Sequence, residues 1–422
     1  MSKQNARRNV VLILCDQLRP DFLHAYGADF IPTPNIDALA ENGVVFDNAI
    51  TASTVCAPAR ESMMTGRFVS DHDAWTNNIS CRDGIVHLPE RLNELGYMTA
   101  AVGIFDHNDS EIGMQYLCLD DHKDRPGTAY REYLSSKYPG ITRHTSGENY
   151  HFKFPEEDFY DRWTTDRATD FIESYTQTGK APDGTAPKDA DAPFFLYCGY
   201  ECPHMPHYPP MEVSGTVNPE DLPEIKIFER TDYVAEVEQY RRAFLNPHET
   251  WADARSAVPQ RMRERLAYCE MIVEIDALVG RIVKSLKDNG IYENTTIIFT
   301  SDHGSVEHDY NVISKGPWPY YSQLFIPMII SNHPRLTPGT HCDALCGNQD
   351  FGATVLDAIG VDERFGVSRS MIGLADGTVP EREVNMSEFC DSCKTLVDKR
   401  FTFTYYPFEM GTCLFDRVND PD

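Results

Sequence analysis

The sequence lacks any long apolar run and any excess of positive charge. No stretch approaches the ~18 consecutive apolar residues that a membrane-spanning helix needs, and the apolar run at residues 10–15 is far shorter than the core of a secretion signal with its cleavage site. Lys and Arg number 38 against 65 Asp and Glu, which gives a formal net charge of -27. Such a surface repels nucleic acid and anionic membranes. We therefore expect no nucleic-acid partner, no membrane partner and a cytoplasmic location.

The sequence also lacks a recognisable cysteine framework, although it contains 12 cysteines. Cys390 and Cys393 have the C-x-x-C spacing, but no second such pair completes a tetrahedral zinc site. Scattered thiols without a secretion signal fit a reducing compartment. With 422 residues and 41% hydrophobic residues, the chain can bury a large core and is long enough for one large domain and a smaller one.

Two short apolar runs, at residues 9–15 (NVVLILC) and 294–300 (NTTIIFT), have the length and composition of buried parallel strands. Helical periodicity with a glycine stop occurs at 34–43 and again at 261–290. This alternation predicts an α/β fold in which helices sandwich a mostly parallel central sheet. Ligands bind such sheets at the carboxyl ends of the strands, and acidic residues follow both runs there.

The chain divides by composition into a large domain at 1–373 and a small C-terminal α+β subdomain at 374–422. Residues 106–191 are rich in Asp, Tyr, Lys, Gly and Pro and lack clean periodicity. We interpret them as an insertion in the large domain that shapes a substrate pocket. The run RFTFTYY at 400–406 has alternating character, which predicts a small antiparallel sheet near the C-terminus.

The stretch VCAPARESMMTGR at residues 55–67 contains Cys56, Pro58 and Arg60 at fixed offsets and ends in a T-G-R triplet. It resembles the signature of the formylglycine-dependent sulfatase family, which belongs to the alkaline phosphatase superfamily. The resemblance implies an alkaline-phosphatase-like fold. It also implies that a formylglycine-generating maturase converts Cys56 to formylglycine (3-oxoalanine), whose hydrate is the nucleophile, and that Arg60 braces this group.

The resemblance extends to a metal site at the two predicted strand ends. It implies that Asp16, Gln17, Asp302 and His303, together with the Cys56-derived group, bind a divalent metal. We expect Ca²⁺, with Mn²⁺ as the alternative, because an imidazole ligand softens the site. Most sulfatases carry Asp-Asp and Asp-Asn at these two pairs. The D-Q and D-H pairs found here resemble the choline-sulfatase and phosphonate monoester hydrolase branches of the superfamily.

Three further residues are catalytic candidates through the same resemblance. Lys315 in SKGPWPYY matches the lysine that binds a sulfate oxygen, and His204 in PHMP matches the histidine that protonates the leaving oxygen. Many sulfatases carry G-K-W-H where residues 103–108 read GIFDHN, so the lysine is missing and the histidine, His107, is displaced by one position. His107 remains a candidate for the catalytic set.

We therefore predict a sulfuric ester hydrolase that acts on a small sulfate ester of a sugar or of an aryl or alkyl alcohol. A first alternative is a phosphonate monoester or phosphodiester hydrolase on the same scaffold, favoured by Gln17 and His303. A second is a non-catalytic, unmodified metal-binding homologue, favoured by the departure at 103–108. The sequence carries no indication of an oligomeric state.

Overall fold

The computed structural model describes residues 7–107, 112–120, 128–140, 147–148, 151–189, 191–226, 257–312, 314–407 and 411–420. Parts of the range 106–191, which we predict as an insertion, lie outside these described residues. Among the described helices, none is both long enough and apolar enough to cross a bilayer.

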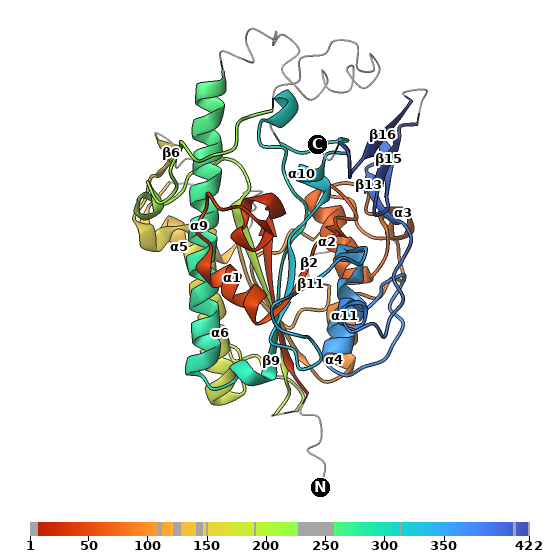
Figure 1. The fold of residues 1–422 in the computed structure, drawn as a ribbon. Coiled ribbons are helices and arrows are strands. Elements are labelled where there is room, and N and C mark those ends of the chain that lie inside the picture. The colour runs from red at the N-terminus through yellow and green to blue at the C-terminus, as the bar shows by residue number, and fades with distance from the viewer. Residues whose placement is uncertain are drawn as a thin grey trace.

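An eight-stranded sheet forms the centre of the molecule (Figure 1). All its neighbouring strands are parallel except at β10, which pairs antiparallel with both of its neighbours. The predicted strands at 9–15 and 294–300 are β1 and β9, and they lie side by side. The order across the sheet is β11 (Thr340–Cys342), β2 (Gly43–Phe46), β10 (Met328–Ser331), β9 (Thr295–Ser301), β1 (Asn9–Asp16), β8 (Phe194–Pro203), β4 (Met98–Ile104) and β5 (Tyr116–Asp120).

Helices cover both faces of this sheet, which explains why β1 is apolar throughout. Val11 and Ile13 pack into one core, whereas Val10 and Leu12 pack into the other. One face carries α1 (Pro34–Glu41), α6 (Tyr160–Thr178) and α9 (Val258–Asp288). The other carries α2 (Cys56–Thr65), α4 (Leu88–Glu94), α11 (Phe351–Ala358) and α12 (Met371–Ala375). The predicted α/β class with a mostly parallel central sheet is confirmed.

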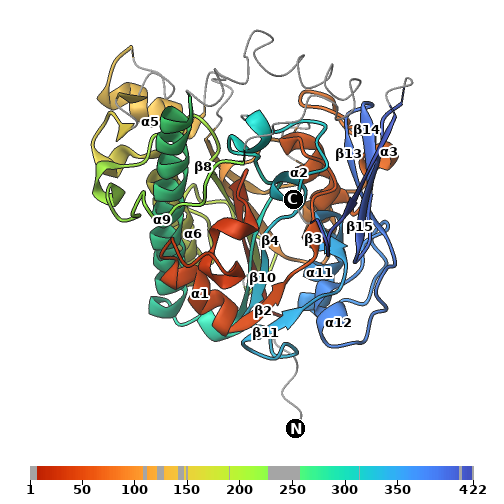
Figure 2. The same ribbon diagram turned by 45° about the horizontal axis from the view of Figure 1, so that its top comes forward.

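A separate four-stranded antiparallel sheet follows in the last part of the chain, as predicted (Figure 2). Its strands are β13 (Asn385–Phe389), β14 (Cys393–Val397), β15 (Phe401–Tyr405) and β16 (Thr412–Asp416). The Glu388 N–H donates to the Ala52 carbonyl at 2.9 Å. The small sheet therefore lies beside the segment that leads into α2. The domain bounds 1–373 and 374–422 stay a prediction.

The remaining elements are short. In the described part of the chain, the other strands are β3 (Ala49–Ile50), β6 (Gly147–Glu148), β7 (His151–Phe152) and β12 (Cys346–Gly347), and the other α-helices are α3 (Val69–His72), α5 (Ala129–Lys137) and α10 (Tyr321–Leu324). Single 3₁₀ turns occur at Pro20–Phe22, His24–Tyr26, Glu156–Asp158, Met211–Val213, Tyr292–Asn294, Asp309–Asn311 and Asn348–Asp350. Within the range predicted as an insertion, α6 packs onto the central sheet through Phe171 and Ile172.

Candidate active site

The carboxyl ends of β1 and β9 bring two buried carboxylates together. Asp16 ends β1 and Asp302 follows β9, and both side chains are fully buried. The Gln17 N–H donates to Asp302 Oδ1 at 3.2 Å, which links the two strand ends. Gln17 has a φ of 66°, a left-handed conformation that turns the chain away from the sheet directly after Asp16.

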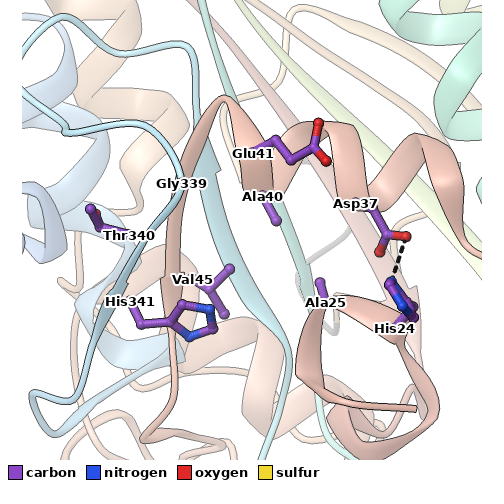
Figure 3. A pocket seen from close by; sticks show the side chains of 9 residues that line it. All are labelled: His24, Ala25, Asp37, Ala40, Glu41, Val45, Gly339, Thr340 and His341. Atoms are coloured by element: carbon purple, nitrogen blue, oxygen red, sulfur yellow. Dashed lines mark hydrogen bonds and ion pairs between the residues drawn. The ribbon is translucent and has the colours of Figure 1, made fainter. Parts of the chain in front are cut away.

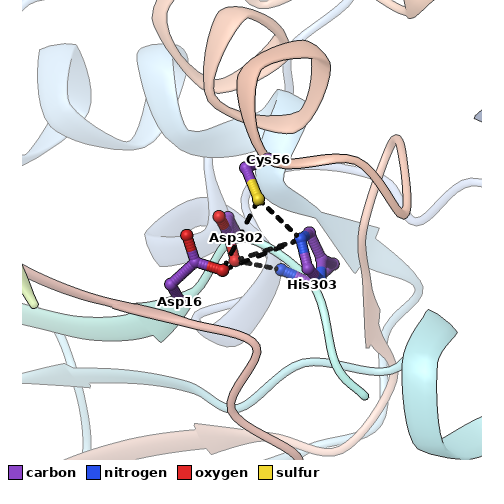
Figure 4. Close-up of side chains that lie close together, drawn as sticks. All are labelled: Asp16, Cys56, Asp302 and His303. Carbon is purple, nitrogen blue, oxygen red and sulfur yellow. Dashed lines mark hydrogen bonds and ion pairs between the residues drawn. The ribbon is translucent and has the colours of Figure 1, made fainter. Parts of the chain in front are cut away.

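Cys56 stands in the first turn of α2 and points into this pair of strand ends (Figure 4). Its Sγ lies 3.2 Å from His303 Nε2 and 3.5 Å from Asp16 Oδ1. The Lys315 Nζ lies 2.6 Å from the same Sγ. Ligand atoms of Asp16, Cys56, Asp302 and His303 all lie within 4.8 Å of one another. The structure thus brings together the residues predicted at both strand ends, the signature cysteine and Lys315.

Arg60 donates hydrogen bonds to both carboxylates. Its Nη2 donates to Asp16 Oδ2 at 2.9 Å and its Nε donates to Asp302 Oδ2 at 3.0 Å. Its Nη1 donates to the Ile104 carbonyl and to the Tyr197 hydroxyl. The guanidinium is fully buried. Because it occupies the two Oδ2 atoms, the two Oδ1 atoms remain turned toward Cys56 and His303.

His303 is fixed as a neutral imidazole. Its Nδ1–H donates to the Gly304 carbonyl at 2.8 Å, so the lone pair of Nε2 faces Cys56 and the two Oδ1 atoms. Burial, assisted by the charge of Lys315, lowers the pKa of His303 to about 4. A neutral imidazole whose second nitrogen is held by a carbonyl is the form in which histidine binds metals.

Burial and mutual repulsion set the charges of this cluster. Burial, together with the negative charge of Asp302, raises the pKa of Asp16. Although burial opposes it, His303 and then Arg60 hold the pKa of Asp302 below its usual value. Burial and the carboxylate of Asp16 raise the pKa of the Cys56 thiol well above its usual value. The unmodified thiol is therefore protonated at neutral pH and is a poor nucleophile.

The donor set fits a divalent cation. Gln17 Nε2 donates to Ser314 Oγ at 3.3 Å, whereas Gln17 Oε1 is buried without a hydrogen-bond partner among the described residues. This amide oxygen, two carboxylates and a neutral imidazole nitrogen are the ligand types that hard and intermediate divalent cations accept. Asp16, Gln17, Asp302 and His303 are therefore the residues that could hold a divalent cation.

His204 lies at the edge of the cluster. It is half-buried, and its Nδ1 lies 2.5 Å from the Met205 carbonyl. Burial, followed by the positive charge of Lys315, lowers the pKa of His204 to about 3. An anionic ester beside these two groups would offset the charge of Lys315 and raise the pKa of His204, as a proton donor requires.

His107, a further member of the predicted catalytic set, contacts Glu61, and its catalytic role stays a prediction. His107 Nδ1 lies 3.2 Å from Glu61 Oε1, and its ring packs against Phe105. Although burial opposes it, His107 and then His87 hold the pKa of Glu61 well below its usual range. The physical reason for this contact is the buried carboxylate of Glu61, which attracts the displaced histidine.

Two contacts at the site have no counterpart in the sequence motifs. The Tyr197 hydroxyl accepts from Arg60, and Asn77 Oδ1 accepts from the Ala57 N–H at 3.1 Å, in the first turn of α2. The strand pattern of β8 places Tyr197 on the α2 side of the sheet, which is a signal that could have found it. No local pattern indicates Asn77, because its partner lies in a different element.

Two of the surface hollows outside the cluster are lined in part by histidine or aromatic side chains. One, of about 270 Å³, opens between His24 and His341, and His24 Nδ1 lies 2.9 Å from Asp37 Oδ2 there (Figure 3). It includes none of the predicted site residues. The other, of about 420 Å³, lies between α3 and the small sheet and is lined in part by Trp75 and Tyr405. Trp75 lies two residues before Asn77, which contacts the first turn of α2.

Comparisons with known proteins find a matching family model and several similar proteins. Residues 8–361 match the family model described as Sulfatase. The chain is 28% identical to the multifunctional alkaline phosphatase superfamily protein PehA of Trinickia caryophylli, over 77% of this chain and 68% of that protein. It is 25% identical to an arylsulfatase of Clostridium perfringens, over 98% of this chain and 88% of that protein. It is 28% identical to human iduronate 2-sulfatase, over 75% of this chain and 57% of that protein.

Solved structures share the fold. A phosphonate monoester hydrolase from Silicibacter pomeroyi superposes with a TM-score of 0.80 at 20% identity, covering 98% of this chain and 89% of that one. The phosphonate monoester hydrolase of Agrobacterium radiobacter gives a TM-score of 0.77 at 23% identity, covering 98% and 90%. At these identities the likeness shows a common fold and no more.

Proposed function

The chain belongs to the sulfatase family, a family of hydrolases, and on that premise we propose that it hydrolyses a small sulfate ester of a sugar or of an aryl or alkyl alcohol. The observation that carries the proposal is the position of Cys56. Its Sγ stands between Asp16, His303 and Lys315, at the start of α2 and at the carboxyl ends of two parallel strands. Residues at such a position can act on a bound anion.

The nucleophile is proposed to be a formylglycine made from Cys56 by a maturase. The hydrated aldehyde supplies one hydroxyl that attacks sulfur and a second whose deprotonation later restores the aldehyde and releases sulfate. The raised pKa of the Cys56 thiol supports this reading, because the unmodified side chain would remain protonated. Asp16 and His303 lie near enough to Cys56 to orient a group at this position.

The metal is proposed to be Ca²⁺, or alternatively Mn²⁺, held by Asp16, Gln17, Asp302 and His303. When bound, such a cation neutralises charge on the ester and lowers the pKa of a coordinated hydroxyl. The buried Gln17 Oε1, which has no hydrogen-bond partner among the described residues, supports this assignment. Arg60 keeps the two carboxylates oriented with one oxygen each toward the site.

Lys315 and His204 are proposed to act on the ester itself. Although burial opposes it, the negative charges around Lys315, Asp16 and Asp302 among them, raise its pKa, so its ammonium is charged at neutral pH and can bind a sulfate oxygen. His204 lies close enough for the charge of Lys315 to affect its pKa, and the Met205 carbonyl holds its Nδ1. His204 would hold the proton that passes to the leaving alcohol oxygen.

The alcohol part of the ester is proposed to occupy the hollow lined in part by Trp75, Tyr405 and Pro407. Aromatic faces suit an aryl group or the apolar face of a sugar. Asp73, Glu388 and Asp391 also line this hollow. Lys394 also lines it and pairs with Glu388 at 2.7 Å, so the hollow keeps an excess of negative charge that disfavours a long sulfated polymer.

The test is the ratio of kcat/KM for an aryl sulfate to that for an aryl phosphonate monoester, measured on matured protein with Ca²⁺ and then with Mn²⁺. We expect the sulfate to be the better substrate. Activity on the phosphonate alone would overturn the assignment in favour of a phosphonate monoester or phosphodiester hydrolase. Gln17 and His303 favour that second candidate, because both depart from the majority sulfatase pattern.

A non-catalytic metal-binding homologue makes a different prediction. It would carry an unmodified Cys56 in fully native protein and would hydrolyse neither ester. The position of the half-buried Lys315 argues against it, because a lysine 2.6 Å from Cys56 Sγ, beside two buried carboxylates, is a candidate for function.

A further inference from the structure

A second cluster of metal-binding side chains lies on the same helix as Cys56. Glu61 is fully buried, and its Oε2 lies 3.1 Å from His87 Nε2 and 3.4 Å from Cys81 Sγ. Ligand atoms of these three residues lie within 4.8 Å of one another. The other oxygen, Oε1, lies 3.2 Å from His107 Nδ1. The sulfate ester hydrolysis proposed above uses none of these four residues.

We propose that Glu61, Cys81 and His87 form a second metal site, selective for Zn²⁺. A thiolate, an imidazole and a carboxylate are the ligands that Zn²⁺ prefers, whereas the cluster around Asp16 is richer in oxygen and suits a harder cation. The thiolate and the carboxylate together carry two negative charges. They would neutralise Zn²⁺, so the bound site would have no net charge to bury.

The distances fit this ion without rearrangement of the backbone. Tetrahedral Zn²⁺ with bonds of about 2.0 Å to nitrogen or oxygen and about 2.3 Å to sulfur places its ligand atoms roughly 3.3 to 3.6 Å apart. The separations of 3.1 Å and 3.4 Å measured from Glu61 Oε2 are close to these values. On binding, the Cys81 S–H bond breaks and its proton passes to water, and a Zn–S bond takes its place. His87 also gives up the Nε2 proton that it donates to Glu61, so that its neutral ring carries its proton on Nδ1 and Nε2 binds the ion.

Neighbouring groups hold the ligands in this orientation. His87 Nδ1 lies 3.8 Å from Glu90 Oε2, and the same carboxylate accepts the His87 backbone N–H at 2.8 Å. This contact turns Nε2 toward Glu61. On the opposite side, His107 contacts Oε1 of Glu61 and leaves Oε2 for the ion. Such outer contacts orient metal ligands and strengthen binding.

The site would link the segment before α4 to helix α2, which carries Cys56. Cys81 and His87 come from the segment before α4, whereas Glu61 comes from α2. The same segment contributes Asn77, whose Oδ1 accepts the Ala57 N–H beside Cys56. Zn²⁺ would therefore stabilise the surroundings of Cys56 without touching the substrate, and the inference stands independently of the proposed function.

The test uses Co²⁺ as a spectroscopic probe on the full chain with Cys56→Ser, so that the cluster around Asp16 has no thiol. We expect one equivalent of Co²⁺ to produce a near-ultraviolet sulfur-to-metal charge-transfer band. Zn²⁺ should abolish the band, and excess Ca²⁺ should not. Adding Cys81→Ser should remove the band. Adding Cys118→Ser instead, at a half-buried thiol on β5, should leave it unchanged.

A second variant keeps the test decisive if Cys81→Ser lowers the yield of folded protein. His87→Gln retains the thiol and should weaken Zn²⁺ affinity at least about tenfold, measured by competition with a chromogenic chelator. Absence of the band in the Cys56→Ser protein would overturn the proposal and leave Glu61 with an ion-pair network only. Persistence of the band in the Cys81→Ser protein would overturn it equally.

Discussion

Arg60 Nε donates to Asp302 Oδ2 at 3.0 Å while the carboxylate Oδ1 of Asp302 remains turned toward Cys56 and His303. Arg60 thus neutralises one oxygen of the carboxylate and leaves the other oxygen available to a ligand. It does the same for Asp16 through Nη2. Two buried carboxylates would otherwise repel each other in a region without water.

Replacing Arg60 with Lys should therefore damage both stability and activity. An ammonium cannot donate to both carboxylates along the two directions of the planar fork. We expect a loss of about 3 kcal/mol in the free energy of unfolding and a fall of at least about 100-fold in kcat/KM. Urea unfolding and aryl sulfate turnover measure the two effects. Arg281→Lys, at an exposed ion pair with Asp166, is the control and should change neither.

Replacing Lys315 with Gln should lower kcat more than it raises KM. The ammonium is proposed to bind an oxygen whose charge grows as the ester bond breaks, so its loss costs more in the transition state than in the ground state. We expect a fall of about 100-fold to 1,000-fold in kcat, by analogy with the loss of one oxyanion donor. Lys399→Gln, at a half-exposed lysine on the small sheet side, should retain full activity. A change of less than about twofold for Lys315→Gln would exclude this role.

Replacing Trp75 with Ala should raise KM for an aryl sulfate and leave kcat unchanged. The side chain is 45% exposed and lines the hollow proposed for the alcohol. Loss of one half-exposed aromatic contact is worth about 1 kcal/mol, which corresponds to roughly a fivefold change in KM. A small alkyl sulfate should show no change, because it does not reach the ring. Met211→Ala, at another exposed apolar residue, serves as the control. Equal effects on both substrates would contradict the assignment of the hollow.

Stability should fall with pH below neutrality because of His72. Its Nδ1 accepts the Ala74 N–H at 3.1 Å, so Nε2 carries the proton and faces Ser62 Oγ at 3.0 Å. Burial lowers the pKa of His72 from 6.5 to about 4. Between these pH values the unfolded chain binds the extra proton and the folded chain does not. The free energy of unfolding therefore has its full value with respect to His72 above pH 6.5. It falls by at most about 3 kcal/mol as the pH falls toward 4.

The measurement for His72 is the free energy of unfolding at pH 7.5 and at pH 5. His72→Asn keeps an acceptor for the Ala74 N–H but does not titrate. We expect the variant to be less stable at pH 7.5 and to lose less stability on acidification than the parent. Other buried histidines titrate alike in both proteins. The loss of stability between pH 7.5 and pH 5 in the parent, minus the same loss in the variant, therefore reports on His72. Parallel loss in the two proteins would contradict the assignment.

Local sequence patterns predict those parts of the structure whose signal lies in residues adjacent in the chain. The apolar run of β1 predicts a strand buried on both faces, and the acidic residue after it predicts the position of Asp16. The spacing around Cys56 predicts the segment that forms helix α2. In each case the residues that carry the signal are adjacent in the chain.

Long-range electrostatics explain what the patterns miss. His107 faces Glu61 because a buried carboxylate attracts it, and no local signal at 103–108 reports a carboxylate on another helix. Helix α6 is a second example, since its face toward the sheet includes Asp161, a buried acid. Its carboxylate accepts the Glu201 and Cys202 N–H groups at 3.0 Å and 2.9 Å. A polar residue at a core position obscures helical periodicity, so the range 106–191 reads as irregular.

The most direct test of the account is the mass of the peptide that contains Cys56, from protein made with a co-expressed formylglycine-generating maturase. The account predicts a decrease that corresponds to replacement of the thiol by an aldehyde, together with aryl sulfate turnover that scales with the modified fraction. An unmodified cysteine in protein that hydrolyses the ester at full rate would contradict it.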